Sequence, residues 1–191
     1  MLEYIEETHQ YLYNGILIPS VSGILHKYLF KDKYKDVPEY ILKAKAEYGS
    51  QLHEAIEILE KDAILIDKLN EQQSLSIKQY LDIKKGNNLE VIKQEEMVCY
   101  KGIYAGRFDM IANINGELSL VDIKTTAKLD LEYLSWQLSL YELAYGKRFK
   151  KFYVLWLPKK EIGQLVEVKR KSKKEIEKLL EEIEKDGSNK V

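Results

Sequence analysis

The fold is decided by residues 106–126, which read Gly106-Arg-Phe-Asp-Met-Ile-Ala-Asn-Ile-Asn-Gly-Glu-Leu-Ser-Leu-Val-Asp-Ile-Lys-Thr-Thr126. Two apolar runs flank Asn115-Gly116, and because both residues of this dipeptide tolerate positive φ, it favours a two-residue type I′ hairpin. Counting back along both strands from so tight a turn places Asp109 directly opposite Asp122. Side chains alternate between the faces of a strand, so Lys124 is expected on the same face as Asp122.

The two faces of this hairpin differ in character. One face is predicted to join the core and carries Phe108, Met110, Ala112, Ser119, Val121 and Ile123. The other face is apolar near the turn and ends in Arg107, Asp109, Asp122 and Lys124. Two carboxylates directly opposite on one face lie roughly 5 Å apart and repel each other, and a divalent cation would turn that repulsion into coordination. We interpret the open end as a metal site; the alternative is a solvated face whose charges are screened by water and by neighbouring basic residues.

The composition is that of an ordinary globular domain. The chain has 191 residues, of which 45% are hydrophobic and 32% are charged, enough for one domain with a substantial core. The net charge is −1, so any nucleic-acid binding requires a local basic patch. The single Cys99 excludes a disulfide framework and a cysteine-ligated zinc or iron–sulfur site. With no signal-peptide core and no apolar run of membrane-spanning length, we expect a cytoplasmic protein without a membrane partner.

The rest of the chain predicts one α/β domain over residues 1–191, with a central mixed sheet flanked by helices. An N-terminal hairpin and a short helix capped by Ser20 or Ser22 occupy residues 1–30, a core occupies residues 38–170, and a C-terminal helix occupies residues 172–186. Within the core we predict helices over 38–62, 67–85 and 130–145 and further strands over 89–100, 150–157 and 164–168.

The first core helix carries Gly49, His53 and Glu57 on one face, because they are spaced four apart. Gly49 costs about 1 kcal/mol of helix propensity relative to Ala, which suggests close packing one turn before His53. From the residues alone, the simpler interpretation is an ordinary histidine paired with Glu57. On the strand before the hairpin, Glu95 or Glu96 could face the Asp109 side, and alternation does not say which.

Four motifs in order resemble a known family. The spacing Asp109…Asp122-Ile-Lys124 resembles the signature of the PD-(D/E)XK nuclease superfamily. Three further patterns resemble the RecB-like, phage-type exonuclease branch of this superfamily. They are Gly49-x-x-x-His53, Gly106-Arg-Phe-Asp109 and Gln137-x-x-x-Tyr141. Asp-x-Lys alone is a weak signal, whereas four motifs in the right order are specific. The chain departs from the pattern in lacking the proline before the first Asp, where Phe108 stands, and the cysteines of iron–sulfur members.

The resemblance implies a restriction-endonuclease-like core and a metal-dependent deoxyribonuclease, a phosphodiester hydrolase of DNA repair, recombination or phage DNA metabolism. It implies that Mg²⁺ or Mn²⁺ is held by His53, Asp109, Asp122 and the Ile123 carbonyl. It makes Asp109, Asp122, Lys124, Gln137 and Tyr141 the catalytic set, in which Lys124 orients the attacking water or stabilises the transition state.

DNA is the expected partner. The predicted substrate contacts are Arg107, Thr125, Gln137, Tyr141, Lys147 and Arg148, with Lys150 and Lys151 as further candidates. The RecB-like motifs favour an exonuclease. The alternatives are a structure- or site-specific endonuclease on the same core, or a non-catalytic DNA- or protein-binding module in phage–host conflict. A recombination or host-defence protein could then be a further partner, and the oligomeric state stays open.

Overall fold

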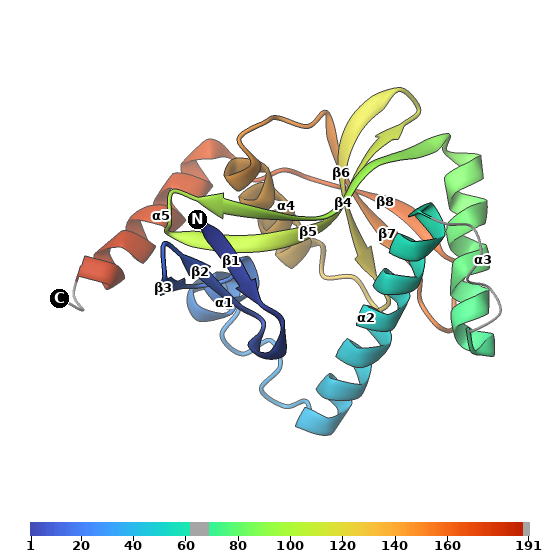
Figure 1. The fold of residues 1–191 in the computed structure, drawn as a ribbon, viewed down its shortest axis with the longest axis horizontal. Helices are drawn as coiled ribbons and strands as arrows, with labels where there is room; N and C mark the ends of the chain where they lie inside the picture. The colour runs from blue at the N-terminus through green and yellow to red at the C-terminus, as the bar shows by residue number, and fades with distance from the viewer. Residues whose placement is uncertain (62–68, 189–191) are drawn as a thin grey trace.

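A five-stranded mixed sheet forms the centre of the molecule (Figure 1). The computed structural model describes residues 1–61 and 69–188. Along the sheet the strands are β4 (Leu89–Tyr100), β5 (Tyr104–Ile114), β6 (Glu117–Lys124), β7 (Lys151–Trp156) and β8 (Gln164–Val168). Neighbours are antiparallel except β6 and β7, which are parallel. The predicted α/β class with a central mixed sheet is therefore confirmed.

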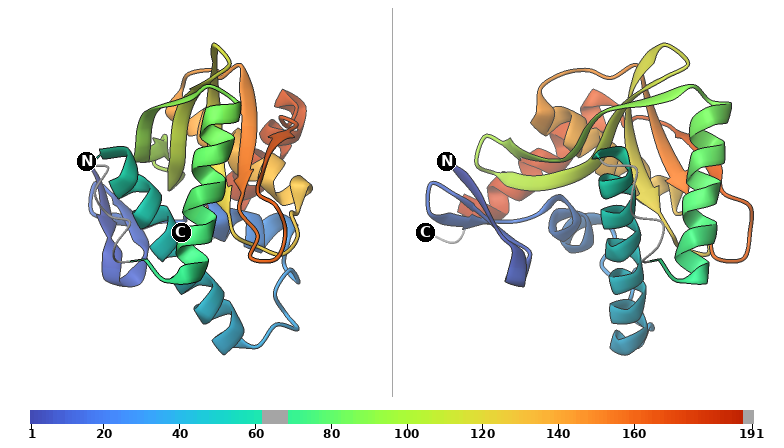
Figure 2. Two further views of the ribbon diagram at one scale, coloured as in Figure 1. Left: turned by 90° about the vertical axis from the view of Figure 1, so that its right-hand side faces the viewer. Right: turned by 45° about the vertical axis from the view of Figure 1, so that its right-hand side comes forward.

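Helices cover both faces of this sheet (Figures 1 and 2). On one face lie α2 (Glu39–Lys61) and α3 (Glu71–Gly86), and on the other lie α4 (Leu131–Tyr145) and α5 (Lys173–Ser188). Leu52 of α2 packs in one core with Val121, whereas Leu134 of α4 packs in a second core with Leu120. Residues 62–68, where the first predicted core helix ends and the second begins, lie outside the described residues. In the described part of the chain, no helix combines the length and the apolarity needed to cross a bilayer.

The predicted hairpin forms at Asn115 and Gly116, whose φ angles are 51° and 85°. Its register runs from Ile114 opposite Glu117 to Met110 opposite Val121, as predicted. All six residues of the predicted core face are buried, but they do not share one core. Phe108 packs on the α4 side, whereas Met110, Ala112, Val121 and Ile123 pack on the α2 side. The opposite face is also buried near the turn, because α4 and α5 cover it.

An N-terminal unit packs against the start of β5. It comprises β1 (Leu2–Ile5), a short 3₁₀ turn η1 (Glu6–Thr8), β2 (Gln10–Tyr13) and β3 (Ile16–Ile18), followed by α1 (Val21–Ile24) and a π-helical turn η2 (Leu25–Leu29). The predicted turn at Asn14-Gly15 is present, and the Ser20 hydroxyl caps α1 by accepting the Gly23 amide. Ile18 and Ala105 share a small core. Strand β1 was not predicted from the sequence.

Beyond Met110 and Val121, strands β5 and β6 separate. The first half of β5 continues with β4 as a long ribbon, whereas β6 continues beside β7 (Figure 1). The Asp109 carboxylate accepts the Ile123 amide at 2.6 Å, and His53 Nε2 lies 3.1 Å from the Ile123 carbonyl oxygen. The amide and carbonyl of one strand residue point to the same edge of the strand. At Ile123, the side chains of Asp109 and His53 therefore occupy the hydrogen-bonding edge of β6 where a neighbouring strand would otherwise pair. We call this opening the fork.

Candidate metal centre and active site

Three elements meet at the fork and each contributes one side chain, namely His53 from α2, Glu95 from β4 and Asp109 from β5. His53 Nδ1 lies 3.6 Å from Asp109 Oδ1 and 4.0 Å from Glu95 Oε1. One ligand atom from each of the three residues lies within 4.8 Å of the others. The three side chains are half-buried. An imidazole with two carboxylates suits a divalent cation, and the nitrogen ligand shifts the preference from Mg²⁺ towards Mn²⁺.

The orientation of His53 leaves its ligand atom free for the cluster. A carbonyl oxygen only accepts hydrogen bonds, so the contact with Ile123 requires that Nε2 carries the proton. In the neutral ring, Nδ1 then keeps its lone pair, and this is the nitrogen that faces the carboxylates. The interpretation of an ordinary His53–Glu57 pair is wrong, because Glu57 instead pairs with Lys61. The Ile123 carbonyl, expected as a metal ligand, orients the histidine in this structure.

Glu95 stands in a strained backbone conformation opposite Asp109. Its φ is 50°, in the left-handed region that non-glycine residues rarely adopt. On either side of it, Gln94 pairs with Met110 and Glu96 pairs with Phe108, so the ladder resumes around the irregular residue. Such strain concentrates at functional sites. The question that alternation left open is thus answered, since Glu95 faces the cluster.

Burial and mutual repulsion raise the pKa values of the site carboxyls. Burial, reinforced by Asp109, raises the pKa of Glu95 to about 7, although Arg107 lies 2.8 Å away and opposes the shift. Burial likewise raises the pKa of Asp122 to about 6, against the opposing influence of Lys124. The site therefore has more carboxylate than its own cations neutralise. A divalent cation would supply that missing charge, so the residues present fit the metal that the resemblance implies.

Asp122 and Lys124 form the second part of the site, on β6. Asp122 is 2% exposed, and its Oδ2 lies 2.6 Å from Lys124 Nζ. Burial alone would lower the pKa of Lys124, but the Asp122 and Asp109 carboxylates outweigh it and raise that pKa, so the ammonium persists. The expectation that Asp109 and Asp122 oppose each other in a regular ladder needs correction. The ladder ends one pair earlier, and Asp122 is outside the compact cluster of three because it faces Lys124.

Helix α4 carries Gln137 and Tyr141. Gln137 Nε2 lies 3.4 Å from the Tyr141 hydroxyl, and among the described residues its buried Oε1 has no hydrogen-bond partner. Burial raises the pKa of Tyr141 well above its usual value, and the Asp109 and Asp122 carboxylates add to the effect. The phenol therefore stays protonated and lies within the electrostatic reach of both carboxylates. Tyr141 therefore lies near the two carboxylates with Gln137 beside it, and their catalytic role stays a prediction.

The predicted substrate contacts divide into two groups. Arg107 is at the site, where it pairs with Glu95 and lies with its guanidinium carbon 5.0 Å from the Tyr4 ring centroid. Thr125 is adjacent as well, since it directly follows Lys124.

The basic run Lys147, Arg148, Lys150 and Lys151 is not brought to the site. Lys151 pairs with Ser119, at the opposite end of β6 from Lys124, which is roughly 17 Å away at the usual strand rise. The other three residues precede Lys151 and lie at that same end.

Sequence reasoning missed two contributors. Glu95 was one of two candidates, and no local signal distinguishes the residue that adopts the left-handed conformation. Tyr4, which contacts Arg107, lies on the strand that was not predicted.

Comparison with known proteins adds little about function. No protein-family model and no curated protein matches the chain. Among solved structures, the crystal structure of SSO0001 is similar over 86% of this chain and 73% of that chain, with a TM-score of 0.46 and 18% sequence identity.

Proposed function

We propose that this protein is a divalent-metal-dependent deoxyribonuclease that hydrolyses phosphodiester bonds. The observation that supports this most is that the cluster of His53, Glu95 and Asp109 lies beside a lysine ammonium held by Asp122. A cation site alone would suit many roles. A cationic donor next to it is what phosphodiester hydrolysis requires, because negative charge builds up on the phosphate oxygens in the transition state.

Each residue has a role that follows from its position. His53, Glu95 and Asp109 would hold Mg²⁺ or Mn²⁺, with Asp122 beside them. When bound, the cation polarises the scissile phosphate and lowers the pKa of the attacking water. Lys124 donates hydrogen bonds to that water or to the phosphate oxygens, and Asp122 keeps it charged and in place.

The remaining side chains position the substrate. Tyr141 is a neutral donor, and Gln137 lies beside it, so both suit contacts with the DNA backbone. Arg107 holds Glu95 and is exposed enough to contact a phosphate. A cytoplasmic location with DNA as the partner agrees with the single reduced cysteine.

We propose an exonuclease rather than an endonuclease, because Gly49/His53 and Gln137/Tyr141 resemble the exonuclease branch. The test is a time course on end-labelled linear DNA and on closed circular DNA with Mg²⁺, Mn²⁺ or chelator. The Asp122→Asn variant, purified in parallel, controls for contaminating nucleases. Cation-dependent loss of linear DNA with intact circles supports an exonuclease.

Two other outcomes would change the assignment. Rapid nicking of circles would favour the endonuclease alternative. Absence of cation-dependent cleavage of both substrates by the parent would mean a non-catalytic binding module.

A further inference from the structure

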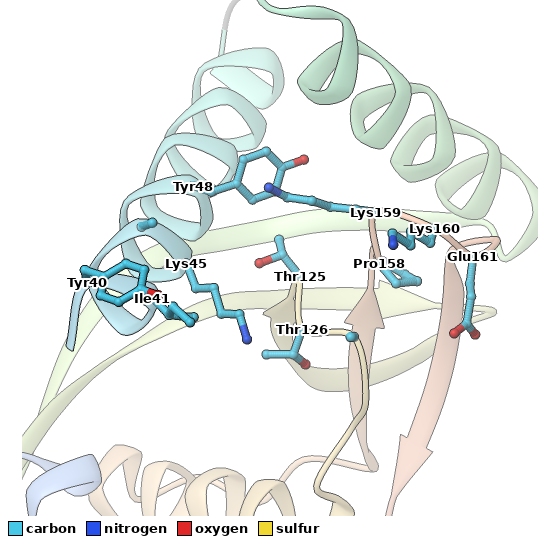
Figure 3. Close-up of a pocket in the computed structure, with 12 residues that line it drawn as sticks. Tyr40, Ile41, Lys45, Tyr48, Thr125, Thr126, Pro158, Lys159, Lys160 and Glu161 are labelled. Carbon is cyan, nitrogen blue, oxygen red and sulfur yellow. The ribbon is translucent and has the colours of Figure 1, made fainter. Parts of the chain in front are cut away.

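A cavity of about 460 Å³ lies beside the candidate metal centre, between α2 and the segments that follow β6 and β7 (Figure 3). Helix α2 lines it with Tyr40, Ile41, Lys45 and Tyr48, and the opposite wall comes from residues 125–127 and 158–161. Because β6 and β7 are parallel, this wall stands at their carboxyl ends. That is where ligands bind in open α/β sheets.

The cavity explains an apolar stripe that the core does not use. Apolar residues recur at helical spacing along all of α2, at Ile41, Ala44, Tyr48, Leu52, Ala55 or Ile56, and Leu59. Of these, only Leu52, Ala55 and Ile56, in the second half of the helix, are buried. The first half of α2 extends beyond the sheet (Figures 1 and 2). There Tyr40 is 73% exposed. Apolar side chains at regular helical spacing therefore face a cavity and not a protein core.

Positive charge surrounds these aromatic side chains. Lys45 reaches towards the segment at Thr126, and Lys159 and Lys160 approach from the opposite wall (Figure 3). Within residues 1–61 and 69–188, none of the three lysines forms an ion pair with a carboxylate. Glu161 is the acidic residue among those that line the cavity. A chain with a net charge of −1 thus concentrates uncompensated lysines at an aromatic surface.

The structure holds this surface in place. The Tyr48 hydroxyl lies 3.1 Å from Ser76 Oγ on α3, and Lys159 Nζ lies 3.7 Å from the centroid of the Tyr48 ring. Trp156 donates its indole N–H to the Thr126 carbonyl at 2.7 Å. Both walls are therefore anchored to the main body of the protein.

The cavity lies next to the candidate metal centre. Thr125, which lines the cavity, directly follows Lys124. A Cβ at Gly49 would lie 3.7 Å from Thr125 Oγ1, and His53 stands one turn further along α2. Along the helix axis, Tyr40 lies about 20 Å from His53. A chain bound at the metal centre can therefore continue into the cavity.

We infer that this cavity binds unpaired nucleotides of single-stranded nucleic acid next to the scissile phosphate. Tyr40 and Tyr48 stack on bases, and Lys45, Lys159 and Lys160 bind the phosphates, which is the combination that recognises single strands without sequence preference. In a duplex the bases are stacked on each other and expose no face to these rings. The inference rests on the proposed nuclease function and adds its substrate class.

The test measures binding without turnover. The probe is a fluorescent 12-nucleotide oligothymidylate, followed by anisotropy in chelator, with a duplex of equal length as competitor. Tyr40→Ala is expected to weaken binding roughly tenfold. Lys160→Ala is expected to reduce the slope of log affinity against log salt by about 0.7. Matched controls on exposed helix positions elsewhere, Leu75→Ala and Lys174→Ala, are expected to bind like the parent.

A second measurement locates the bound oligonucleotide on the protein. An oligonucleotide carrying 5-iodouracil should photo-cross-link to the peptide that contains Tyr40 or Tyr48, as mapped by mass spectrometry. Cross-links elsewhere, equal competition by duplex, absence of binding, or parent-like binding by the Tyr40→Ala and Lys160→Ala variants would each overturn the inference.

This outcome is separable from that of the nuclease proposal. A parent that cuts DNA but lacks binding in the cavity disproves the inference alone. A parent that binds single strands there but never cuts disproves the nuclease proposal alone.

Discussion

The Asp109 carboxylate accepts the Ile123 backbone amide at 2.6 Å, so a side chain of β5 takes the place of a backbone carbonyl in the sheet. The same carboxylate faces His53 through its other oxygen. Substitution of Asp109 would therefore damage both the sheet and the metal centre, and its effects on chemistry would be hard to separate from its effects on folding. Among the described residues, the side chains of Asp122 and Lys124 form no hydrogen bond with the backbone, so substitutions there allow cleaner tests.

Asp122→Asn is expected to reduce cation-dependent DNA cleavage roughly 100-fold or more, because it removes the charge that holds Lys124. The fold should survive, since Asn keeps the shape and burial already disfavours the charged carboxylate. Cleavage rates and thermal unfolding check both parts. Asp82→Asn, on the exposed face of α3, is the matched control. Parent-like cleavage by the Asp122 variant would show that the active-site assignment is wrong.

Lys124→Met is expected to lower turnover roughly 100-fold while Mn²⁺ affinity stays the same or rises slightly. The substitution keeps the apolar stem but removes a donor to the reacting phosphate and a charge that repels the cation. Calorimetric titration with Mn²⁺ and single-turnover cleavage measure the two quantities. Lys128→Met, four residues further along and exposed, serves as control. Loss of Mn²⁺ binding with unimpaired residual cleavage would contradict the role given to Lys124.

His53→Gln is expected to weaken Mn²⁺ binding roughly tenfold or more and Mg²⁺ binding less, because imidazole favours the softer ion. Calorimetry with each cation measures the ratio. His9→Gln tests a histidine on the exposed N-terminal unit and should leave both affinities unchanged. Equal losses for the two cations, or none, would mean that His53 is not a ligand.

The metal-free protein is expected to lose stability as pH rises. Burial raises the pKa of Glu95 from 4.5 to about 7, so the folded state binds this proton more tightly than the unfolded state. Stability should then fall between about pH 4.5 and pH 7, by roughly 1–3 kcal/mol. Asp122, with its pKa raised to about 6, acts in the same direction.

The measurement is urea unfolding in chelator at pH 5, 6, 7 and 8. Glu95→Gln should flatten the decline of stability with pH. Glu96→Gln should not, because Glu96 is not part of the cluster and its Oε2 lies 2.7 Å from Lys93 Nζ. Saturating Mn²⁺ should also remove the decline. Identical pH profiles for the two variants would show that Glu95 is not the group responsible.

Gly106→Ala is expected to destabilise the protein by roughly 1–3 kcal/mol and to slow cleavage, because overpacking shifts neighbouring side chains. A Cβ there would lie 2.5 Å from Tyr141 Cε1 and 3.2 Å from Val21 Cγ2. Gly49→Ala is the matched control. Its Cβ would meet only Thr125 Oγ1 at an ordinary 3.7 Å, and it gains about 1 kcal/mol of helix propensity. Equal effects of the two substitutions on urea unfolding would refute this difference.

Local chemistry made much of the fold predictable. The dipeptides Asn14-Gly15 and Asn115-Gly116 determine their turns, and the turns set the register of both hairpins. Strand β4 begins and ends as predicted, because turn residues bound it at Asn88 and at Lys101-Gly102. Strand β8 also has its predicted bounds. These features depend on neighbours in sequence.

The fork was not predictable in the same way. Counting along strands assumes that the ladder continues, but a register shift between Val91 and Lys93 and the left-handed residue Glu95 bend β4 and β5 away from β6. Periodicity along α2 likewise identifies an apolar face without revealing where the sheet beneath it ends.

The remote position of Lys147, Arg148, Lys150 and Lys151, which were predicted to contact the substrate, has a different cause. A helix that joins parallel strands returns the chain to the beginning of its neighbour, so residues just before β7 must lie far from the end of β6. Once β6 and β7 are known to be parallel, the remote position of Lys147 to Lys151 follows.

The backbone at Glu95 has a consequence for laboratory evolution of this protein. Gly or Asn adopts a left-handed conformation at lower cost than Glu, so a library screened only for heat resistance would favour those residues at position 95. The survivors would keep the hairpin and the sheet but lose one carboxylate from the metal centre. Selection for thermostability therefore has to score cleavage in the same round, because at this position durability and catalysis favour different amino acids.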